Sequence, residues 1–317
     1  MSGPDSRTAV SRVAVVGTGV IGASWAALFL AQGLDVAATD PAPEAEAALR
    51  RTVETHWPVL ERIGLRMGAS PDRLRFHSSL EAALESVQFV QESGPERSEL
   101  KQELYRRMDA ATAEDVLLAS SSSTKTVSQM QAACVRPGRV VLGHPFNPPH
   151  LIPLVEVVGG QRTEASAIDR TMAFYSAIGK RPIRLQKEVL GHIANRLQAA
   201  LWQEAFHLVE TGVASVADID VAIAHGPGLR WALLGPFLNL HLSGGAGGMR
   251  YLLDHLGPPT EDMWRDLGVA CLTEPLKETI VNGTNEELAR INLEEVVRRR
   301  DELLVQLVKL KNATDLP

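Results

Sequence analysis

The sequence predicts an α/β protein in which a doubly wound sheet is followed by an all-helical C-terminal domain. In the first half of the 317 residues, short apolar runs alternate with longer amphipathic stretches, as in a parallel sheet wound with helices. From residue 193 onward, apolar residues follow the helical period and strand-like runs are scarce. We therefore predict a disordered leader over 1–11, a sheet domain over 12–190 and a helical domain over 191–317.

The strands of the first domain are expected at six apolar runs, and a seventh, strand-like run follows at 154–157. The six are 13–16, 34–39, 74–76, 87–90, 116–119 and 139–143. A charged amphipathic segment over 96–111 is expected to be helical, starting at Gly94-Pro95-Glu96 because proline is favoured in the first helical turn.

The second domain is expected to consist of helices over 193–211, 216–224, 249–255 and 286–311. Loops are predicted where glycines cluster in its middle, at positions 226, 228, 235, 244, 245, 247 and 248.

Composition narrows the class of protein. Hydrophobic residues make up 45% and charged residues 22%, a balance typical of a soluble protein with a core. The net charge of -6 argues against a nucleic-acid partner. No long apolar segment predicts a signal peptide or a membrane span. The two cysteines lack metal-like spacing, so we expect no metal site and a cytoplasmic protein.

The first predicted strand leads into a glycine turn that is typical of dinucleotide binding in a Rossmann-type domain. Such a turn lets a pyrophosphate approach the backbone at the start of the following helix. The second predicted strand ends at Asp40, eighteen residues after the last glycine, where a carboxylate accepts ribose hydroxyls and repels a 2′-phosphate. We therefore predict NAD as the cofactor, bound by Asp40 and the turn Gly17, Thr18, Gly19, Val20, Ile21 and Gly22.

Three further segments bring polar side chains to the carboxyl edge of the predicted sheet. A serine run ending at Ser123 follows one strand, His144 follows the next, and Glu156 lies among apolar residues twelve positions later. Oxidation of a secondary alcohol requires a base for the hydroxyl proton, and imidazole titrates near neutral pH. A carboxylate can orient that imidazole. We expect His144 and Glu156 to form the proton-transfer pair, with Ser123 and Asn195 holding the substrate oxygen.

These segments together resemble the 3-hydroxyacyl-CoA dehydrogenase family. The resemblance is carried by Ala-Ser-Ser-Ser-Ser-Thr (119–124), Gly-His-Pro-Phe-Asn-Pro-Pro (143–149), Leu-Val-Glu-Val-Val (154–158) and Gly-His-Ile-Ala-Asn-Arg-Leu (191–197). It implies that Asn147 supports the site and that Glu96 and Lys101 approach the cofactor, as Ser123 and Asn147 also would. It also implies a homodimer formed through the helical domain.

The substrate is less firmly indicated. Lys125 follows the serine run where the family differs, and it is either an anion contact or merely exposed. The motifs resemble the branch that acts on free small hydroxy acids, and L-carnitine is the leading candidate. Its quaternary ammonium would suit the aromatic faces of Trp231 and Phe237, and Arg230 would meet its carboxylate.

Several alternatives remain open at this point. The chain could act instead on L-gulonate or on a 3-hydroxyacyl-CoA such as 3-hydroxybutyryl-CoA. It could also be a crystallin-like structural protein that only binds NAD. A structural role requires none of the four residues Ser123, His144, Glu156 and Asn195, which argues against that last alternative.

Overall fold

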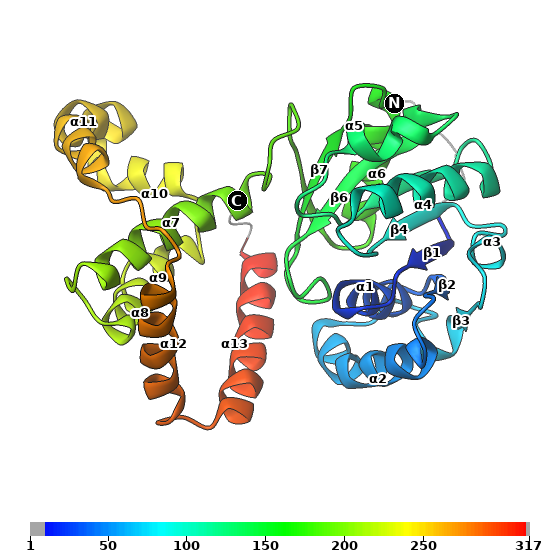
Figure 1. The fold of residues 1–317 in the computed structure, drawn as a ribbon, viewed down its shortest axis with the longest axis horizontal. Helices are drawn as coiled ribbons and strands as arrows, with labels where there is room; N and C mark the ends of the chain where they lie inside the picture. The colour runs from blue at the N-terminus through cyan, green and yellow to red at the C-terminus, as the bar shows by residue number, and fades with distance from the viewer. Residues whose placement is uncertain (1–9, 315–317) are drawn as a thin grey trace. The chain divides into compact units, whose positions relative to one another are not determined.

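The computed structural model describes residues 10–314, so most of the predicted leader and the last three residues lie outside the described part. The chain divides into two compact units, one up to Asn195 and one from Arg196 onward. We describe each unit by itself (Figure 1).

The first unit contains a sheet of eight strands in the order β3-β2-β1-β4-β5-β6-β7-β8. The first six strands are parallel, whereas β7 is antiparallel to β6 and β8 is parallel to β7. The predicted doubly wound sheet is thus confirmed, and the last two strands at one side of it, β7 and β8, run opposite to the rest. The strands are β1 (Arg12–Val16), β2 (Asp35–Thr39), β3 (Leu74–Phe76), β4 (Phe89–Glu92), β5 (Leu117–Ser120), β6 (Val140–Pro145), β7 (Leu154–Gly159) and β8 (Arg181–Arg184).

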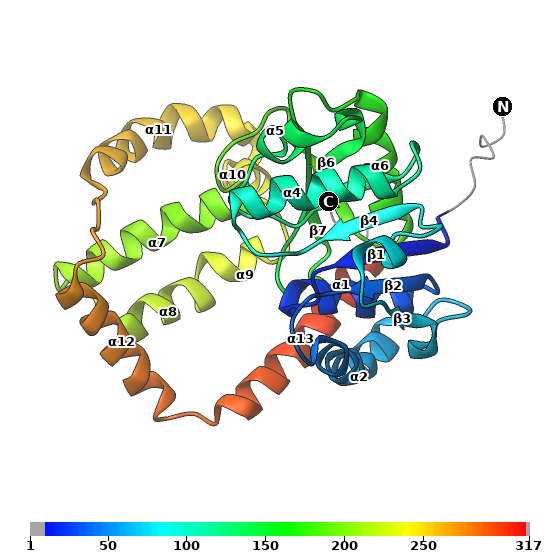
Figure 2. The ribbon, with the colours of Figure 1, turned by 45° about the vertical axis from the view of Figure 1, so that its right-hand side comes forward.

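Helices cover both faces of this sheet, and the alternating strand side chains form one apolar cluster on each face (Figures 1 and 2). One face is packed by α1 (Val20–Ala31), α2 (Ala45–Ile63) and α6 (Ala165–Ala177). The other face is packed by α3 (Leu80–Ala83), α4 (Ser98–Ala111) and α5 (Val127–Met130). Short 3-10 turns occur at Pro71–Arg73, Gln131–Ala133 and Pro137–Arg139.

The second unit is all-helical, as predicted, apart from its connecting loops. Its helices are the remainder of α7 (Ala194–Glu210), then α8 (Val216–His225), α9 (Pro227–Trp231), α10 (Pro236–Ser243), α11 (Gly248–Asp266), α12 (Glu274–Leu288) and α13 (Leu293–Ala313). A 3-10 turn spans Gly245–Gly247 between α10 and α11.

Several predicted helix bounds were wrong. The helix expected over 249–255 continues to Asp266, and Gly228, expected in a loop, lies within α9. The helix expected over 286–311 is broken after α12, because Asn292 caps a new helix by accepting a hydrogen bond from the Glu295 amide. Helix α4 begins at Ser98 rather than near Glu96, since Arg97 is still extended.

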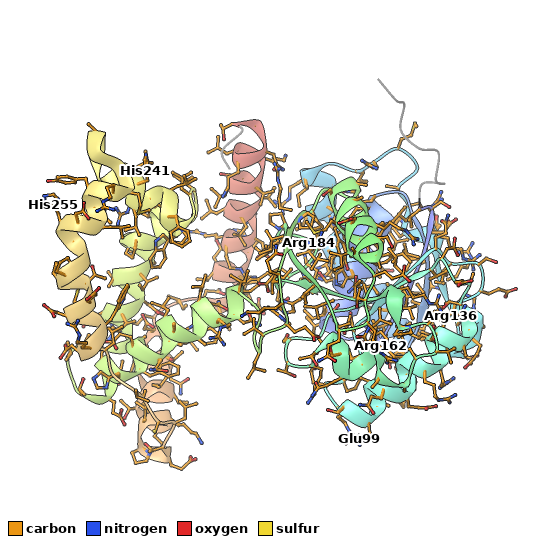
Figure 3. All side chains as sticks on the ribbon, turned by 90° about the horizontal axis from the view of Figure 1, so that it is seen from above. Glu99, Arg136, Arg162, Arg184, His241 and His255 are labelled. Carbon is orange, nitrogen blue, oxygen red and sulfur yellow. The ribbon has the colours of Figure 1, made fainter. Side chains whose placement is uncertain are left out.

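The two units differ in how much apolar surface they bury by themselves. Side chains crowd between the layers of the first unit, whereas in the second many project outward from the helices, as on α10 and α11, which carry His241 and His255 (Figure 3). Among the described residues of the second unit, the buried apolar side chains are Leu252, Leu276 and Val305. None of the helices in the described part of the chain is long and apolar enough to span a membrane.

Candidate active site

The glycine turn lies where the strand order reverses, between β1 and β4. Gly17 has a φ of +88°, and a Cβ there would lie 2.7 Å from the backbone carbon of Ser93. A Cβ on Gly22 would lie 1.9 Å from the carbonyl oxygen of Gly17. A Cβ on Gly19, by contrast, would meet nothing within 4 Å. Two glycines therefore permit close backbone packing, and the third leaves open space at the start of α1.

This open space has the properties that a dinucleotide requires. Gly19 is the N-cap residue of α1, so the first amides of the helix lack partners within the helix and point toward that side. Asp40 follows β2 and is held by the Thr18 amide on Oδ2 at 2.7 Å and by the Ala42 amide on Oδ1 at 2.9 Å. The turn and its carboxylate thus form one hydrogen-bonded assembly.

The register of β6 and β7 brings His144 and Glu156 together. The two residues are directly paired across the antiparallel strands, so their side chains lie on the same face of the sheet. The His144 Nδ1 lies 2.9 Å from Glu156 Oε2, and both side chains are buried. Because a carboxylate only accepts hydrogen bonds, Nδ1 carries the proton and Nε2 presents a lone pair.

The Glu156 carboxylate accepts two further hydrogen bonds, on its other oxygen. The amides of Ile193 and Ala194 donate to Oε1 at 2.8 and 3.0 Å. Burial raises the pKa of this carboxyl, but the hydrogen bonds from His144 and the two amides outweigh it, and the pKa lies below its usual range. Glu156 is therefore an ionised, fully bonded carboxylate that fixes the His144 ring.

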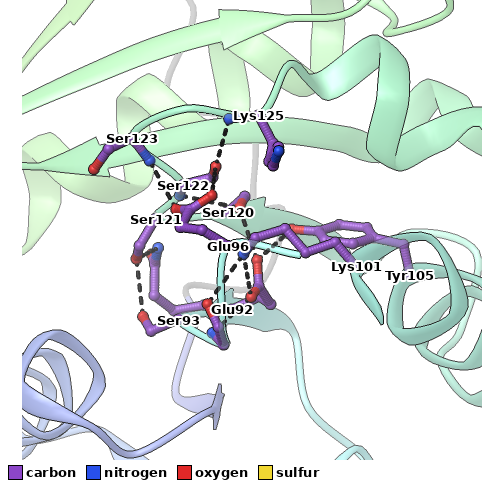
Figure 4. A network of polar contacts seen from close by, with 12 residues as sticks. Glu92, Ser93, Glu96, Lys101, Tyr105, Ser120, Ser121, Ser122, Ser123 and Lys125 are labelled. Atoms are coloured by element: carbon purple, nitrogen blue, oxygen red, sulfur yellow. Dashed lines mark hydrogen bonds and ion pairs between the residues drawn. The ribbon is translucent and has the colours of Figure 1, made fainter. Parts of the chain in front are cut away.

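Ser123 completes this set at the free nitrogen of the imidazole. Its Oγ lies 3.2 Å from His144 Nε2, which can accept the hydroxyl proton. The loop that carries Ser123 is held by Glu96, whose carboxylate accepts from the Ser123 amide at 3.0 Å and the Ser122 hydroxyl at 2.7 Å (Figure 4). The structure thus brings Ser123, His144 and Glu156 together, as the sequence predicted. It also joins Glu96 to the serine loop through hydrogen bonds.

Lys101, which the resemblance places near the cofactor, is buried within the first unit. Its ammonium donates to Glu92 Oε1 at 2.7 Å, and the Ser120 hydroxyl donates to Oε2 of the same carboxylate at 2.7 Å (Figure 4). Glu92 itself is fully buried at the end of β4. Burial and the nearby Glu92 charge raise the pKa of Tyr105 well above its usual range. This network, absent from the sequence prediction, joins the ends of β4 and β5 to α4.

The remaining predicted residues take diverse positions. Asn147 is exposed in the loop that follows β6, and Asn195 is half-buried in the first turn of α7, directly after the amides that bind Glu156. Arg230, Trp231 and Phe237 belong to α9 and α10 of the second unit, and all three are exposed.

His192 is a site residue that the sequence prediction missed. It is 5% exposed, and its ring centroid lies 4.8 Å from that of His144. Its Nε2 donates to the Ser122 carbonyl at 3.0 Å, whereas its Nδ1 is buried without a hydrogen-bond partner among the described residues. Its φ of 53° lies in the left-handed region. Strain and an unpaired polar atom are both unusual away from functional sites, although neither is visible in a sequence.

Comparison with known families gives two matches that together span most of the chain. Residues 12–189 match the NAD binding domain of 3-hydroxyacyl-CoA dehydrogenase, and residues 191–269 match the C-terminal domain of the same family.

Individual relatives agree with this assignment. The chain is 50% identical to an L-carnitine dehydrogenase of Streptomyces griseus over 95% of this chain and 90% of that one. It is 47% identical to an L-carnitine dehydrogenase of Pseudomonas aeruginosa over 95% of this chain and 94% of that one. A similar solved structure is an NAD⁺-dependent dismutase, a 5-dehydrogenase of a formyl-hydroxy-methylpyridine carboxylic acid. Its TM-score is 0.81 at 27% identity, with 96% of this chain and 98% of that chain covered.

Proposed function

This chain belongs to the 3-hydroxyacyl-CoA dehydrogenase family and is an NAD-dependent dehydrogenase acting on CH–OH groups, and from that premise we propose that it oxidises L-carnitine to 3-dehydrocarnitine. The observation that carries the proposal is the hydrogen-bonded set of Ser123, His144 and Glu156 at the carboxyl edge of the sheet. The choice of L-carnitine is supported by the names of the two relatives described above.

The residues around the glycine turn fit the cofactor. The open space at Gly19 and the unpaired amides of α1 would hold the pyrophosphate, and Asp40 would accept the ribose hydroxyls. When bound, NAD accepts the hydride that leaves the carbinol carbon. We assign Glu96 to the same side of the site because it orders the loop that carries Ser123, and Asn147 to its support.

The proton chemistry follows from the tautomer of His144. Glu156 holds the proton on Nδ1, so Nε2 is free to take the proton of the substrate hydroxyl. The carboxylate then stabilises the imidazolium that results. Ser123, at 3.2 Å from Nε2, would donate to the substrate oxygen together with Asn195. We propose Arg230, Trp231 and Phe237 as substrate contacts contributed by the helical unit.

The direct test compares substrates and one variant. NADH formation is followed by absorbance with L-carnitine, L-gulonate and 3-hydroxybutyryl-CoA side by side. We expect L-carnitine to give the highest kcat/KM, and no turnover of L-carnitine would refute the choice. The variant His144→Gln should lose about 10²–10⁴-fold in kcat while its affinity for NADH is unchanged. Activity close to that of the wild type would show that His144 is not the base.

We also propose that the helical unit, taken as residues 191–317, pairs with a second copy of the chain. Large apolar side chains are exposed along its helices, for example Trp202 at 50%, Leu253 at 55% and Trp264 at 66%. Extensive exposed apolar surface is typical of obligate interfaces. Sedimentation equilibrium should give the mass of two chains, and a monomer at micromolar concentration would contradict the proposal.

We also propose a cytoplasmic location. It is supported by the free thiols of Cys134, which is buried, and Cys271, which is exposed.

A further inference from the structure

A cavity of about 190 Å³ lies in the first unit beside the His144–Glu156 pair. Its floor includes Leu142 and Val158, which are paired across β6 and β7 two positions from His144 and Glu156. Alternate residues share a face of a sheet, so the cavity floor lies on the catalytic face, about 7 Å along the strands. His192, whose ring is 4.8 Å from that of His144, lines the cavity as well.

One anion and one cation line this cavity, and no ion pair joins the two among the described residues. Glu188 lies at the wall, but both of its oxygens are used, because the Ser128 amide and hydroxyl donate to them at 2.9 and 2.5 Å. Lys125 also lines the cavity and is half-buried. Its backbone amide donates to the hydroxyl of Ser122 at 2.9 Å. Its ammonium makes neither a hydrogen bond nor an ion pair with any described residue (Figure 4).

The wall also carries one unsatisfied polar atom. The Nδ1 of His192 is buried without a partner, and the ring is held in place by its bond to Ser122. Because Nε2 carries the proton, Nδ1 of the neutral ring is an acceptor, and a carboxylate cannot bond to it directly. A water that donates one hydrogen to Nδ1 and the other to a bound carboxylate satisfies it and removes the penalty of an unpaired buried atom. The cavity thus combines a free cation, an unsatisfied ring nitrogen and apolar walls beside the proton-transfer pair.

We propose that this cavity is the subsite for the free carboxylate of the substrate, and that Lys125, in place of Arg230, is its charge partner. The inference rests on the proposed oxidation of an L-3-hydroxy acid at His144. A quaternary ammonium is disfavoured here because Lys125 would repel it, whereas the carboxylate of Glu188 is already engaged by the two donors of Ser128. A CoA thioester has no anionic oxygen at this position, and its bulk exceeds the cavity. Lys125 therefore selects free 3-hydroxy acids over thioesters, esters and amides.

The test removes the charge of Lys125 and measures whether the resulting loss of substrate affinity requires the substrate carboxylate. Lys125→Met should raise the KM for L-carnitine about 10- to 100-fold, the usual effect of losing a charge-assisted hydrogen bond. The kcat/KM for the carboxamide of L-carnitine should change by less than about threefold, because the amide has no charge to lose. Lys125→Arg should restore much of the affinity for the acid. The matched control is Lys187→Met, which removes an exposed lysine outside the cavity and should alter neither substrate.

Each outcome has a defined meaning. An unchanged KM for the acid, a lower one, or an equal loss for acid and amide overturns the carboxylate subsite, provided that NADH affinity shows a folded variant. If the wild type oxidises another free acid such as L-gulonate instead of L-carnitine, the choice of substrate fails. The Lys125 test is then run on that acid and its amide. Turnover confined to the CoA thioester overturns both the choice of substrate and the carboxylate subsite at Lys125.

Discussion

Replacing Glu156 by glutamine tests the proton-transfer pair most sharply, because the change removes one acceptor oxygen and little else. The carboxylate accepts from three donors, namely His144 Nδ1 and the amides of Ile193 and Ala194. A glutamine has one acceptor oxygen and one NH₂ group. Whichever way the amide is turned, it presents donors either to the two backbone amides or to the imidazole.

The first orientation leaves two buried amides facing an NH₂ group, which destabilises the start of α7. The second forces the imidazole proton from Nδ1 to Nε2, so that the ring can no longer accept the substrate proton. Either way the imidazolium loses its carboxylate partner. We expect kcat to fall about 10²–10⁴-fold, equivalent to about 3–5 kcal/mol in the activation free energy.

The assay is steady-state NADH formation, together with NADH binding followed by fluorescence. The affinity of Glu156→Gln for NADH should match that of the wild type, because the proposed cofactor contacts lie at the glycine turn. Glu156→Asp serves as the control that keeps the charge but shortens the side chain. Its kcat should lie between those of the wild type and Glu156→Gln. A kcat for Glu156→Gln within threefold of the wild type would refute the proton-transfer role.

Two further predictions concern the cofactor and acid stability. Asp40→Ala removes the carboxylate that follows β2, so it should weaken NAD binding and relax the rejection of NADP; an unchanged ratio of the two Kd values would contradict the assignment. Burial, reinforced by the nearby charges of His56 and Lys180, lowers the pKa of His150 to about 3. The unfolded chain therefore binds an extra proton between about pH 3 and 6.5, and His150 lowers the stability of the folded state as the pH falls through that window, by about 2 kcal/mol at pH 5 relative to pH 8. In urea unfolding, His150→Gln should lose less unfolding free energy than the wild type between pH 8 and pH 5. Equal losses for the two proteins would disprove the role of His150.

The sequence predicted those site residues whose neighbours along the chain are enough to place them. Gly17 and Asp40 each follow a buried parallel strand, and strands of this kind end at one edge of the sheet. His144 follows β6 in the same way. For these residues, strand prediction alone gives the location of the side chain.

Other features depend on partners that the local sequence does not reveal. Lys101 on α4 pairs with Glu92 at the end of β4, and nothing in the helix sequence predicts that ion pair. Strand β8 is only four residues long and its arginines are exposed, so its apolar pattern is too weak to detect. The break before α13, however, was predictable, because Asn292 followed by Glu295 is a helix-capping pattern.

The pairing of His144 with Glu156 follows from core packing on the opposite face of the sheet. On β7, Val155 and Val157 belong to the apolar cluster packed by α1 and α6, whereas Glu156 points to the other face. A slip of one residue in the register would turn both valines away from that cluster and bury a carboxylate within it. The free energy of burying two valines, about 3–6 kcal/mol, together with the penalty for an unpaired buried charge, therefore selects the register that places Glu156 opposite His144. The twelve-residue spacing of the pair is thus set by the core of the sheet rather than by any local feature of the active-site loops.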